Sequence, residues 1–207
     1  MTDPDAGRSG SSVVLASRNQ HKVAEVARIL ELHAPGLVVV GLDDVAPDLP
    51  DIAETGSSFV ENALIKARAV SAATGLPAMS DDSGICVDAL NGMPGIRSAR
   101  WAGRHGDDLA NLELLLAQVD DLPDARRGAQ FVCAAAFVAP DGSELVAEGV
   151  LAGSLLRSPR GTNGFGYDPI FVPAGAQRTT AEMTPDEKDA ISHRGRAFRA
   201  LAGLLAQ

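Results

Sequence analysis

Two adjacent carboxylates, Asp81 and Asp82, occupy the segment SDDSG at residues 80–84. Apolar residues precede this segment at 76–79 and follow it at 85–87, so the pattern predicts a strand, a tight acidic turn and a second strand. Asp, Ser and Gly are common turn residues, and a solvated turn is therefore the simplest interpretation. Paired carboxylates are also the ligands that hold a hard cation such as Mg²⁺.

Other charged residues favour a chemical role over a plain turn. Glu54 and Asp88 add carboxylates on either side, and separate segments carry Lys, His and Arg in positions suited to phosphate. Carboxylates that bind a metal ion, facing cations that bind phosphate oxygens, describe a phosphoryl-transfer site. The elements that carry these groups must then bring them to one place.

Length and charge limit the class of protein. A chain of 207 residues forms one domain or one two-lobed unit with a real core. The net charge of −9 argues against non-specific nucleic-acid binding but permits a local cationic pocket. No apolar run reaches membrane-spanning length, so no membrane partner is expected.

The N-terminal residues and the cysteines point to a cytoplasmic protein. Residues 1–12 are polar and lack the apolar core of a signal peptide, which predicts a disordered tail before a domain at 13–207. Cys86 and Cys133 lie in apolar runs and are expected to be buried free thiols rather than a disulfide or a metal pair.

A short buried strand at 13–16 runs into the polar segment SRNQHK at 17–22, and a helix follows up to Pro35. This order places free backbone N–H groups and Lys22 at the positive end of the helix, which is a natural anion site. The segment lacks the glycines of a P-loop. A capped helix with an exposed Lys22 is the alternative.

A second helix is predicted to begin at Ser58, which has capping-box spacing with Glu61, and to end at Gly75. Asn62 and Lys66 are four residues apart and share a face of this helix outside its apolar stripe. They could reach a ligand or be solvated.

The middle of the chain combines a long loop, a helix and a hairpin. The loop at 91–106 is of a length that is usually functional or disordered. Asp107 or Asp108 is expected to cap the next helix, and strands at 129–138 and 144–156 are expected to pair. The residues expected to face inward from the helix are Leu109, Leu112, Leu115 and Leu116.

Two segments near the C-terminus could bind a ligand. The glycine-dense loop at 161–169 lets backbone approach a ligand and offers Phe165 or Tyr167 for stacking, although a structural omega-like loop is equally consistent. Ser192 begins a last helix with His193 and Arg194 in its first turn, where cations oppose the helix dipole and suggest a nearby anion. The apolar stripe expected on this helix is Ala197, Leu201, Leu204 and Leu205.

Six blocks, in order, resemble the inosine/xanthosine triphosphate pyrophosphatase family, also called XTP/dITP diphosphatases. They are SRNQHK from Ser17, ETGSSFVENALIKA from Glu54, SDDSGICVDAL from Ser80, GMPGIRSARWAG from Gly92, TNGFGYDPIF from Thr162 and EKDAISHRGRAF from Glu187. Each block is weak alone, but together they are specific and span nearly the whole chain after the tail.

The resemblance implies an α/β fold with an elongated mixed central sheet flanked by helices, and two lobes around a substrate cleft. It implies a homodimer that hydrolyses ITP, dITP and XTP to the monophosphate and pyrophosphate, with Mg²⁺ as cofactor. The biological role that it implies is cleansing of the nucleotide pool.

The resemblance also assigns roles to residues. Asp82 corresponds to the proton acceptor, and Glu54 and Asp82 help to hold magnesium, with Lys66 and Asp81 in support. The implied substrate-binding residues are Ser17, Arg18, Asn19, Gln20, His21, Lys22, Ser83, Phe165, Gly166, Tyr167, Asp168, Lys188, His193 and Arg194. Residues 17–22 line the triphosphate and 165–168 cradle the nucleoside.

Three positions depart from the family pattern. Ser17 stands where many members have Thr, and Asn163 stands where Gly is common, although Asn tolerates left-handed backbone. Arg18 replaces a small residue, and it either adds a phosphate contact or narrows the entrance.

Three other interpretations compete with this one. A pyrophosphatase of the Maf type is disfavoured by the SHR block and the GFGYDP loop. A nucleotide sensor without turnover is disfavoured because Glu54, Asp81 and Asp82 are all present. A structural α/β domain would require six ordered matches by coincidence.

Overall fold

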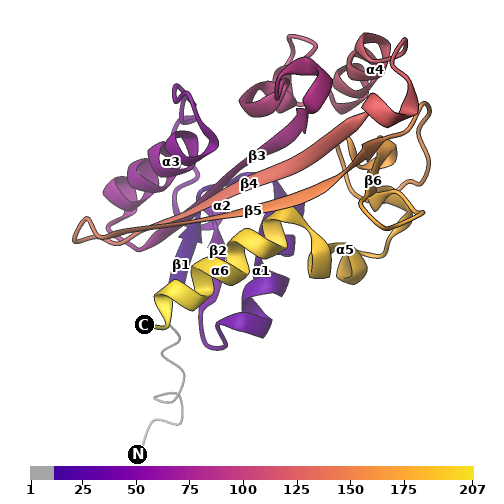
Figure 1. Ribbon diagram of the computed structural model, residues 1–207. Coiled ribbons are helices and arrows are strands. Elements are labelled where there is room, and N and C mark those ends of the chain that lie inside the picture. The colour runs from indigo at the N-terminus through magenta and orange to yellow at the C-terminus, as the bar shows by residue number, and fades with distance from the viewer. Residues whose placement is uncertain (1–11) are drawn as a thin grey trace, which may run out of the picture.

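The computed structural model describes residues 12–207, in which a mixed sheet of six strands has the order β2-β1-β3-β4-β5-β6 (Figure 1). The first three strands run parallel, and β3 to β6 pair antiparallel in succession. The strands are β1 Ser12–Leu15, β2 Val38–Gly41, β3 Ala78–Val87, β4 Gly128–Val138, β5 Glu144–Leu155 and β6 Phe171–Pro173. The predicted α/β fold with a mixed central sheet is confirmed. The tail expected at residues 1–12 lies outside the described residues, except that Ser12 opens β1.

Helices cover both faces of this sheet (Figure 1). On one face, α1 and α6 contribute Leu30 and Phe198 to a buried cluster with residues of β1, β3 and β4. On the opposite face, Ala63 and Ala67 of α3 pack against small residues of β4. The helices are α1 Gln20–His33, α2 Leu42–Val45, α3 Phe59–Thr74, α4 Asp108–Gln118, α5 Pro185–Ile191 and α6 His193–Leu205.

The predicted hairpin gives the molecule its long axis (Figure 1). β4 and β5 pair continuously from Val138 opposite Glu144 to Gly128 opposite Ser154. The β6 strand pairs with the far end of β5 only. The long hairpin therefore connects a lobe built on β1, β2 and α3 with a second lobe built around α4 and β6.

Capping side chains fix the helix ends as the sequence predicts. Ser58 accepts the N–H of Glu61 at the start of α3, and Gly75 closes that helix with a left-handed φ of 67°. The capping box at Ser58 is only half formed, because the Glu61 carboxylate binds Ser57 instead. Ser192 caps α6.

The tight turn predicted at SDDSG is wrong, because residues 78–87 form one uninterrupted strand. Asp81 pairs with Ala135 and Asp82 with Ala134 in a ladder that continues on both sides. Pairing with β4 satisfies the backbone N–H and C=O groups of this buried segment, which a turn there would leave without partners. Local turn preference therefore yields to the sheet.

Two leucines predicted to face the core are exposed. Leu109 has 66% of its surface exposed and Leu204 has 38%, so both predictions are wrong. Phe198 of α6 is fully buried, although it was not included in the predicted apolar stripe. Cys86 and Cys133 are free thiols as predicted, although only Cys133 is fully buried.

A glycine on β3 controls how closely the neighbouring loop packs. A Cβ atom at Gly84 would collide with the carbonyl oxygen of Gly95 and the hydroxyl of Ser98, both in the 3₁₀ helix Gly95–Arg100. We expect Gly84→Ala to lower the free energy of unfolding by about 2 kcal/mol, because overpacking typically costs that much. Urea unfolding measures the change. As a control, Gly203→Ala in α6 has open space around it and should be neutral or stabilising. Equal effects of the two changes would contradict the packing argument.

Candidate active site

A cavity of about 870 Å³ lies where the two lobes meet. One wall comes from the start of α1 and the loop before α3, and the other comes from the loop at 95–108 and the glycine-rich loop at 161–169. Asp81, predicted in a supporting role, does not line the cavity, whereas the residues predicted to hold substrate or metal all do. These are Ser17, Arg18, Asn19, Gln20, His21, Lys22, Glu54, Asp82, Ser83, Phe165, Gly166, Tyr167, Asp168, Lys188, His193 and Arg194.

Asp81 and Asp82 point to opposite faces of the sheet. Neighbouring residues of a strand alternate in direction, and both carboxylates lie on the continuous strand β3. Asp82 reaches Asn62 on α3, whereas Asp81 reaches Arg194 on α6. Asp82 lines the cavity and Asp81 does not. The pair therefore divides into one carboxylate that faces the cavity and one that is buried beside it.

Asp82 sits in a polar environment supplied by α3. Its Oδ2 accepts a hydrogen bond of 2.9 Å from Nδ2 of Asn62, and its Oδ1 lies 3.9 Å from Nζ of Lys66. Burial raises the pKa of Asp82, and the nearby Glu54 charge adds to this, although Lys66 opposes it. A raised pKa makes the ionised carboxylate a stronger base than an exposed Asp.

Lys66 and Arg100 hold Glu54, the second cavity carboxylate, in place. Its two oxygens bind Nζ of Lys66 at 2.6 Å and Nη2 of Arg100 at 2.7 Å. Burial opposes ionisation, but these cations outweigh it and lower the pKa of Glu54. Lys66 thus contacts both Glu54 and Asp82, which shows that the two carboxylates converge on one positive charge. Asp88, also considered as a site acid, does not line the cavity.

Asp81 anchors the buried side of the strand. Its Oδ2 accepts bonds of 3.1 Å from both Nε and Nη2 of Arg194, and lies 3.4 Å from Nζ of Lys22. Burial opposes the Asp81 charge, yet Arg194, Lys22 and Lys66 hold the pKa of Asp81 well below its ordinary value. Arg194 also binds Glu25 at 2.7 Å. The cation in the first turn of α6 suggested a nearby anion. Asp81 and Glu25 of the protein itself supply that negative charge.

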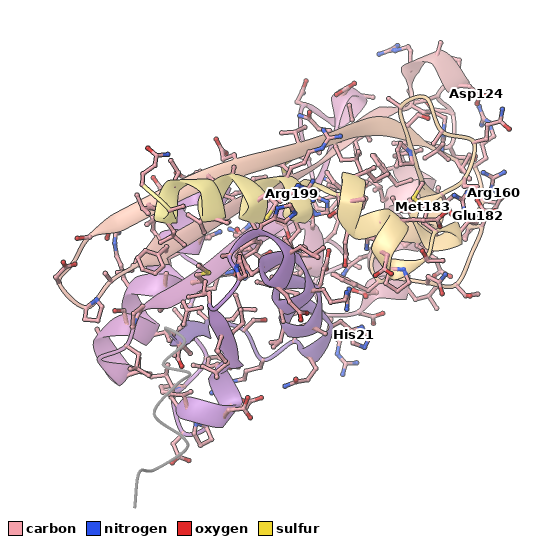
Figure 2. All side chains as sticks on the ribbon, turned by 90° about the horizontal axis from the view of Figure 1, so that it is seen from below. His21, Asp124, Arg160, Glu182, Met183 and Arg199 are labelled. Atoms are coloured by element: carbon pink, nitrogen blue, oxygen red, sulfur yellow. The ribbon has the colours of Figure 1, made fainter. Side chains whose placement is uncertain are left out.

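The start of α1 is more fully satisfied than the sequence suggests. The Asn19 side chain accepts the N–H groups of His21 and Lys22, at 3.0 and 3.2 Å. The prediction of a helix end with free N–H groups is wrong at these two positions. The Lys22 ammonium, rather than the helix backbone, is the cationic group offered here. His21 is exposed at the same end of α1 (Figure 2).

The glycine-rich loop is held by Asp168. Its Oδ2 accepts the backbone N–H of Phe165 at 2.9 Å and binds Nζ of Lys188 at 2.5 Å, while Oδ1 accepts the hydroxyl of Thr180. Lys188 also lies 5.1 Å from the ring centre of Phe165. This arrangement presents the half-buried Phe165 ring to the cavity beside a cation.

Tyr167 and Gly166 have structural partners. The Tyr167 hydroxyl donates to the backbone oxygen of Ser98 at 2.8 Å, and its ring is buried. Burial raises the pKa of Tyr167, so the phenol stays protonated. The N–H of Gly166 donates to Asp108 at 2.9 Å. Phe165 is therefore the ring of this loop that is available for stacking.

His193 offers a neutral imidazole to the cavity. Its ring stacks on Phe131 with centres 4.8 Å apart and planes 12° from parallel. Burial, with help from Arg194 and Lys188, holds the pKa of His193 well below its ordinary value. Its Nδ1 is buried and has no partner among the described residues. A buried polar atom without a partner costs free energy.

The cavity cations differ in how firmly the protein holds them. Lys188 and Lys66 contact carboxylates at 2.5 and 2.6 Å, whereas Lys22 lies 3.4 Å from Asp81. The Lys22 side chain is also 20% exposed. Lys22 is therefore well placed to bind an additional anion.

Sequence analysis missed Glu25 and Arg100, which hold the charged groups of the site. Glu25 is 5% exposed and lies among the buried residues of α1. A charged residue on an otherwise apolar helix face could have indicated a buried ion pair. Arg100 lies in the segment predicted as a long irregular loop. That segment has no periodic pattern from which the position of a side chain could be predicted. Asn62 and Lys66 were noticed on a shared helix face, and the structure places both beside Asp82.

The chain is similar to known proteins over most of its length. The sequence model of the Ham1 family matches residues 13–204. A dITP/XTP pyrophosphatase of Streptomyces coelicolor is 58% identical over 195 residues, covering 94% of this chain and 97% of that protein. The crystal structure of a nucleoside-triphosphatase, dITP/XTP pyrophosphatase, from Mycobacterium abscessus is 59% identical with a TM-score of 0.75, covering 95% of this chain and 100% of that one. A HAM1 protein structure from Coxiella burnetii is 43% identical with a TM-score of 0.84, covering 94% and 98%.

The buried contact between Asp81 and Arg194 should dominate the stability of the site. We expect Asp81→Asn to lower the free energy of unfolding at pH 7 by about 3 kcal/mol, because it removes one partner of a buried ion pair. The pKa of Asp81 is lowered in the folded state, so its contribution is present above the unfolded value of about 4 and is lost as pH falls below it.

Urea unfolding at pH 7 and pH 3 measures both effects. The difference between wild type and Asp81→Asn should be smaller at pH 3. The control Glu144→Gln removes a partner of the exposed Arg68 and should cost less than about 1 kcal/mol. An equal or smaller loss for Asp81→Asn than for the control would contradict the assignment of a buried anchor.

Proposed function

The chain belongs to the Ham1 family, and on this premise we propose that it hydrolyses non-standard purine nucleoside triphosphates to the monophosphate and pyrophosphate. The proposed substrates are ITP, dITP and XTP, and their removal cleanses the nucleotide pool. Relatives with 58% and 59% identity are named dITP/XTP pyrophosphatases. The observation that carries the proposal is that Asp82 shares one cavity with Lys22, Phe165 and Lys188.

Asp82 is the proposed proton acceptor. Hydrolysis requires that a water loses a proton while its oxygen attacks the α-phosphorus and the bond to the pyrophosphate oxygen breaks. The Asp82 carboxylate takes this proton. Asn62 orients the carboxylate through its hydrogen bond to Oδ2, and burial makes the carboxylate more basic.

Glu54 and Asp82 are the residues proposed to hold Mg²⁺. Both contact the Lys66 ammonium, so the pair is already arranged around positive charge. Among residues 12–207 no group of three or more His, Cys, Asp or Glu gathers as a metal cluster. One or two carboxylates together with substrate phosphates are a usual Mg²⁺ environment, so this donor set fits. When bound there, the ion would neutralise phosphate charge and favour attack at phosphorus.

Lys22 and the adjacent turn, from Ser17, are proposed to bind the triphosphate. The Lys22 ammonium is held loosely by Asp81, so phosphate oxygens can compete for it. Positive charge near the departing pyrophosphate stabilises the transition state more than the ground state, because negative charge develops on the leaving oxygen. Lys22 therefore both binds the substrate and assists the leaving group.

The base is proposed to stack on Phe165 beside Lys188, His193 and Arg194. These side chains can donate hydrogen bonds, with His193 as a neutral imidazole. A 6-oxo group accepts such bonds, whereas the amino group of adenine would face other donors. A site built for this recognition discriminates strongly against adenine.

We also propose that residues 13–207 act as a single two-lobed domain and form a homodimer in the cytoplasm. The family resemblance supports the dimer, and the net charge of −9 supports the absence of a nucleic-acid partner. Across residues 12–207, none of the helices has the length and apolar character needed to cross a bilayer. Light scattering after size exclusion measures the oligomeric state.

One assay tests the reaction directly. ITP incubated with the protein and Mg²⁺ should yield IMP and pyrophosphate, separated by ion-exchange chromatography. We expect kcat/KM for ITP and XTP to exceed that for ATP by at least about 100-fold, because adenine mismatches the donors around the base. IDP and phosphate as products, or a preference for ATP, would reject the proposal.

The role of Asp82 is tested by Asp82→Asn, which keeps the shape but removes the base. We expect kcat to fall by about 100- to 10,000-fold, the usual contribution of a general base. Asp88→Asn, on the same part of the chain but outside the cavity, should keep wild-type turnover. Circular dichroism checks that both variants fold. Pyrophosphate release by Asp82→Asn at near the wild-type rate would show that another group accepts the proton.

A further inference from the structure

One guanidinium joins two segments at the cavity. Arg18 follows the end of β1, and its side chain is bound by groups on and after α2. It donates to the carboxylate of Asp43 and to the backbone oxygens of Pro47, at 3.3 Å, and Leu49. Its Nε also lies 3.6 Å from Asp51. Four groups therefore hold Arg18 away from the phosphate turn to which its backbone belongs.

The segment that Arg18 holds forms part of the cavity wall. Residues 46–53 form neither helix nor strand and lead directly to Glu54. Residues 50–53 line the cavity together with Glu54. Leu49 and Ile52 pack only partly into the apolar cluster beneath. A segment without regular structure takes its position from such side-chain anchors.

We propose that Arg18 is a positioning residue, which fastens the segment 46–53 to the phosphate turn at 17–22. By this contact it sets the place of the wall at 50–53 relative to Lys22. It also helps Lys66 and Arg100 to position Glu54, which follows that wall. The effect on catalysis rests on the proposed function, whereas the fastening itself is a property of the nucleotide-free protein. A planar guanidinium with five N–H donors can satisfy carboxylates and carbonyls at once, which a lysine ammonium does less well.

The competing role for Arg18 is direct contact with phosphate, since its side chain is 33% exposed and lines the cavity. The two roles differ in what they predict for Asp43. If Arg18 fastens the segment, loss of Asp43 loosens it and weakens catalysis in the same direction as loss of Arg18. If Arg18 binds phosphate, loss of Asp43 frees the guanidinium and strengthens substrate binding.

Amide hydrogen exchange tests the fastening without metal or nucleotide. We expect Arg18→Ala to raise exchange at residues 46–54 by about tenfold, the effect of losing charge-assisted hydrogen bonds, while the strands stay protected. Arg18→Lys should restore part of the protection. The control Arg68→Ala removes an exposed arginine of α3 that pairs with Glu144, and it should leave residues 46–54 unchanged. Unchanged exchange in Arg18→Ala would overturn the proposal.

Kinetics with ITP and Mg²⁺ distinguish the two roles of Arg18. We expect Arg18→Ala and Asp43→Asn each to lower kcat/KM, and the double variant to be no worse than Arg18→Ala, because both remove one contact. A lower KM in Asp43→Asn, with the full Arg18→Ala loss retained in its background, would show that Arg18 binds phosphate and would overturn the proposal. If wild type fails to hydrolyse ITP, the proposed function is rejected, while the exchange experiment still decides whether Arg18 fastens the segment.

Discussion

The alternation of side chains along β3 is the constraint on which the site depends. Asp81 and Asp82 are adjacent on a continuous strand, so they must face opposite sides of the sheet. One side is covered by α1 and α6, which supply Lys22 and Arg194, and the other by α3, which supplies Asn62. The strand thereby holds a buried anchor and a carboxylate that faces the cavity at a fixed separation. Cations from both ends of the chain reach one cavity because α1 and α6 cover the same face of the sheet beside β3.

The buried charges on the α1 and α6 side specify geometry more than they stabilise the fold. Arg194 is 1% exposed and binds Asp81 and Glu25, so three charges are removed from water together. Desolvation of such groups offsets much of their attraction, and apolar residues of similar size often stabilise a core equally well. What the ion pairs add is orientation. Two carboxylates fix the plane of the Arg194 guanidinium, whose carbon then lies 5.8 Å from the centre of the Phe165 ring.

Sequence patterns predicted the parts of the molecule that depend on local chemistry. The hairpin of β4 and β5 and the caps of α3 and α6 follow from turn and capping residues, and the predicted site residues that line the cavity follow from motif blocks. The failures depend on distant partners. SDDSG looks like a turn until β4 pairs with it, and Leu204 has helical spacing with buried residues but is itself exposed. Glu25 has no apparent role until α6 brings Arg194 to it, across 169 positions of sequence.

The electrostatics of the cavity connect metal and substrate binding. Its basic side chains are Arg18, Lys22, Lys66, Arg100, Lys188 and Arg194, and its acidic ones are Asp51, Glu54, Asp82, Asp108 and Asp168. Because the two sets nearly cancel and the whole chain carries −9, the protein alone offers a triphosphate little excess positive charge. Glu54 and Asp82 now share Lys66, and a divalent cation on these carboxylates would add charge where the cavity lacks it. Lys66 would then be freed to face phosphate. Binding of metal and nucleotide should therefore be mutually favourable, since each supplies the charge that the other requires.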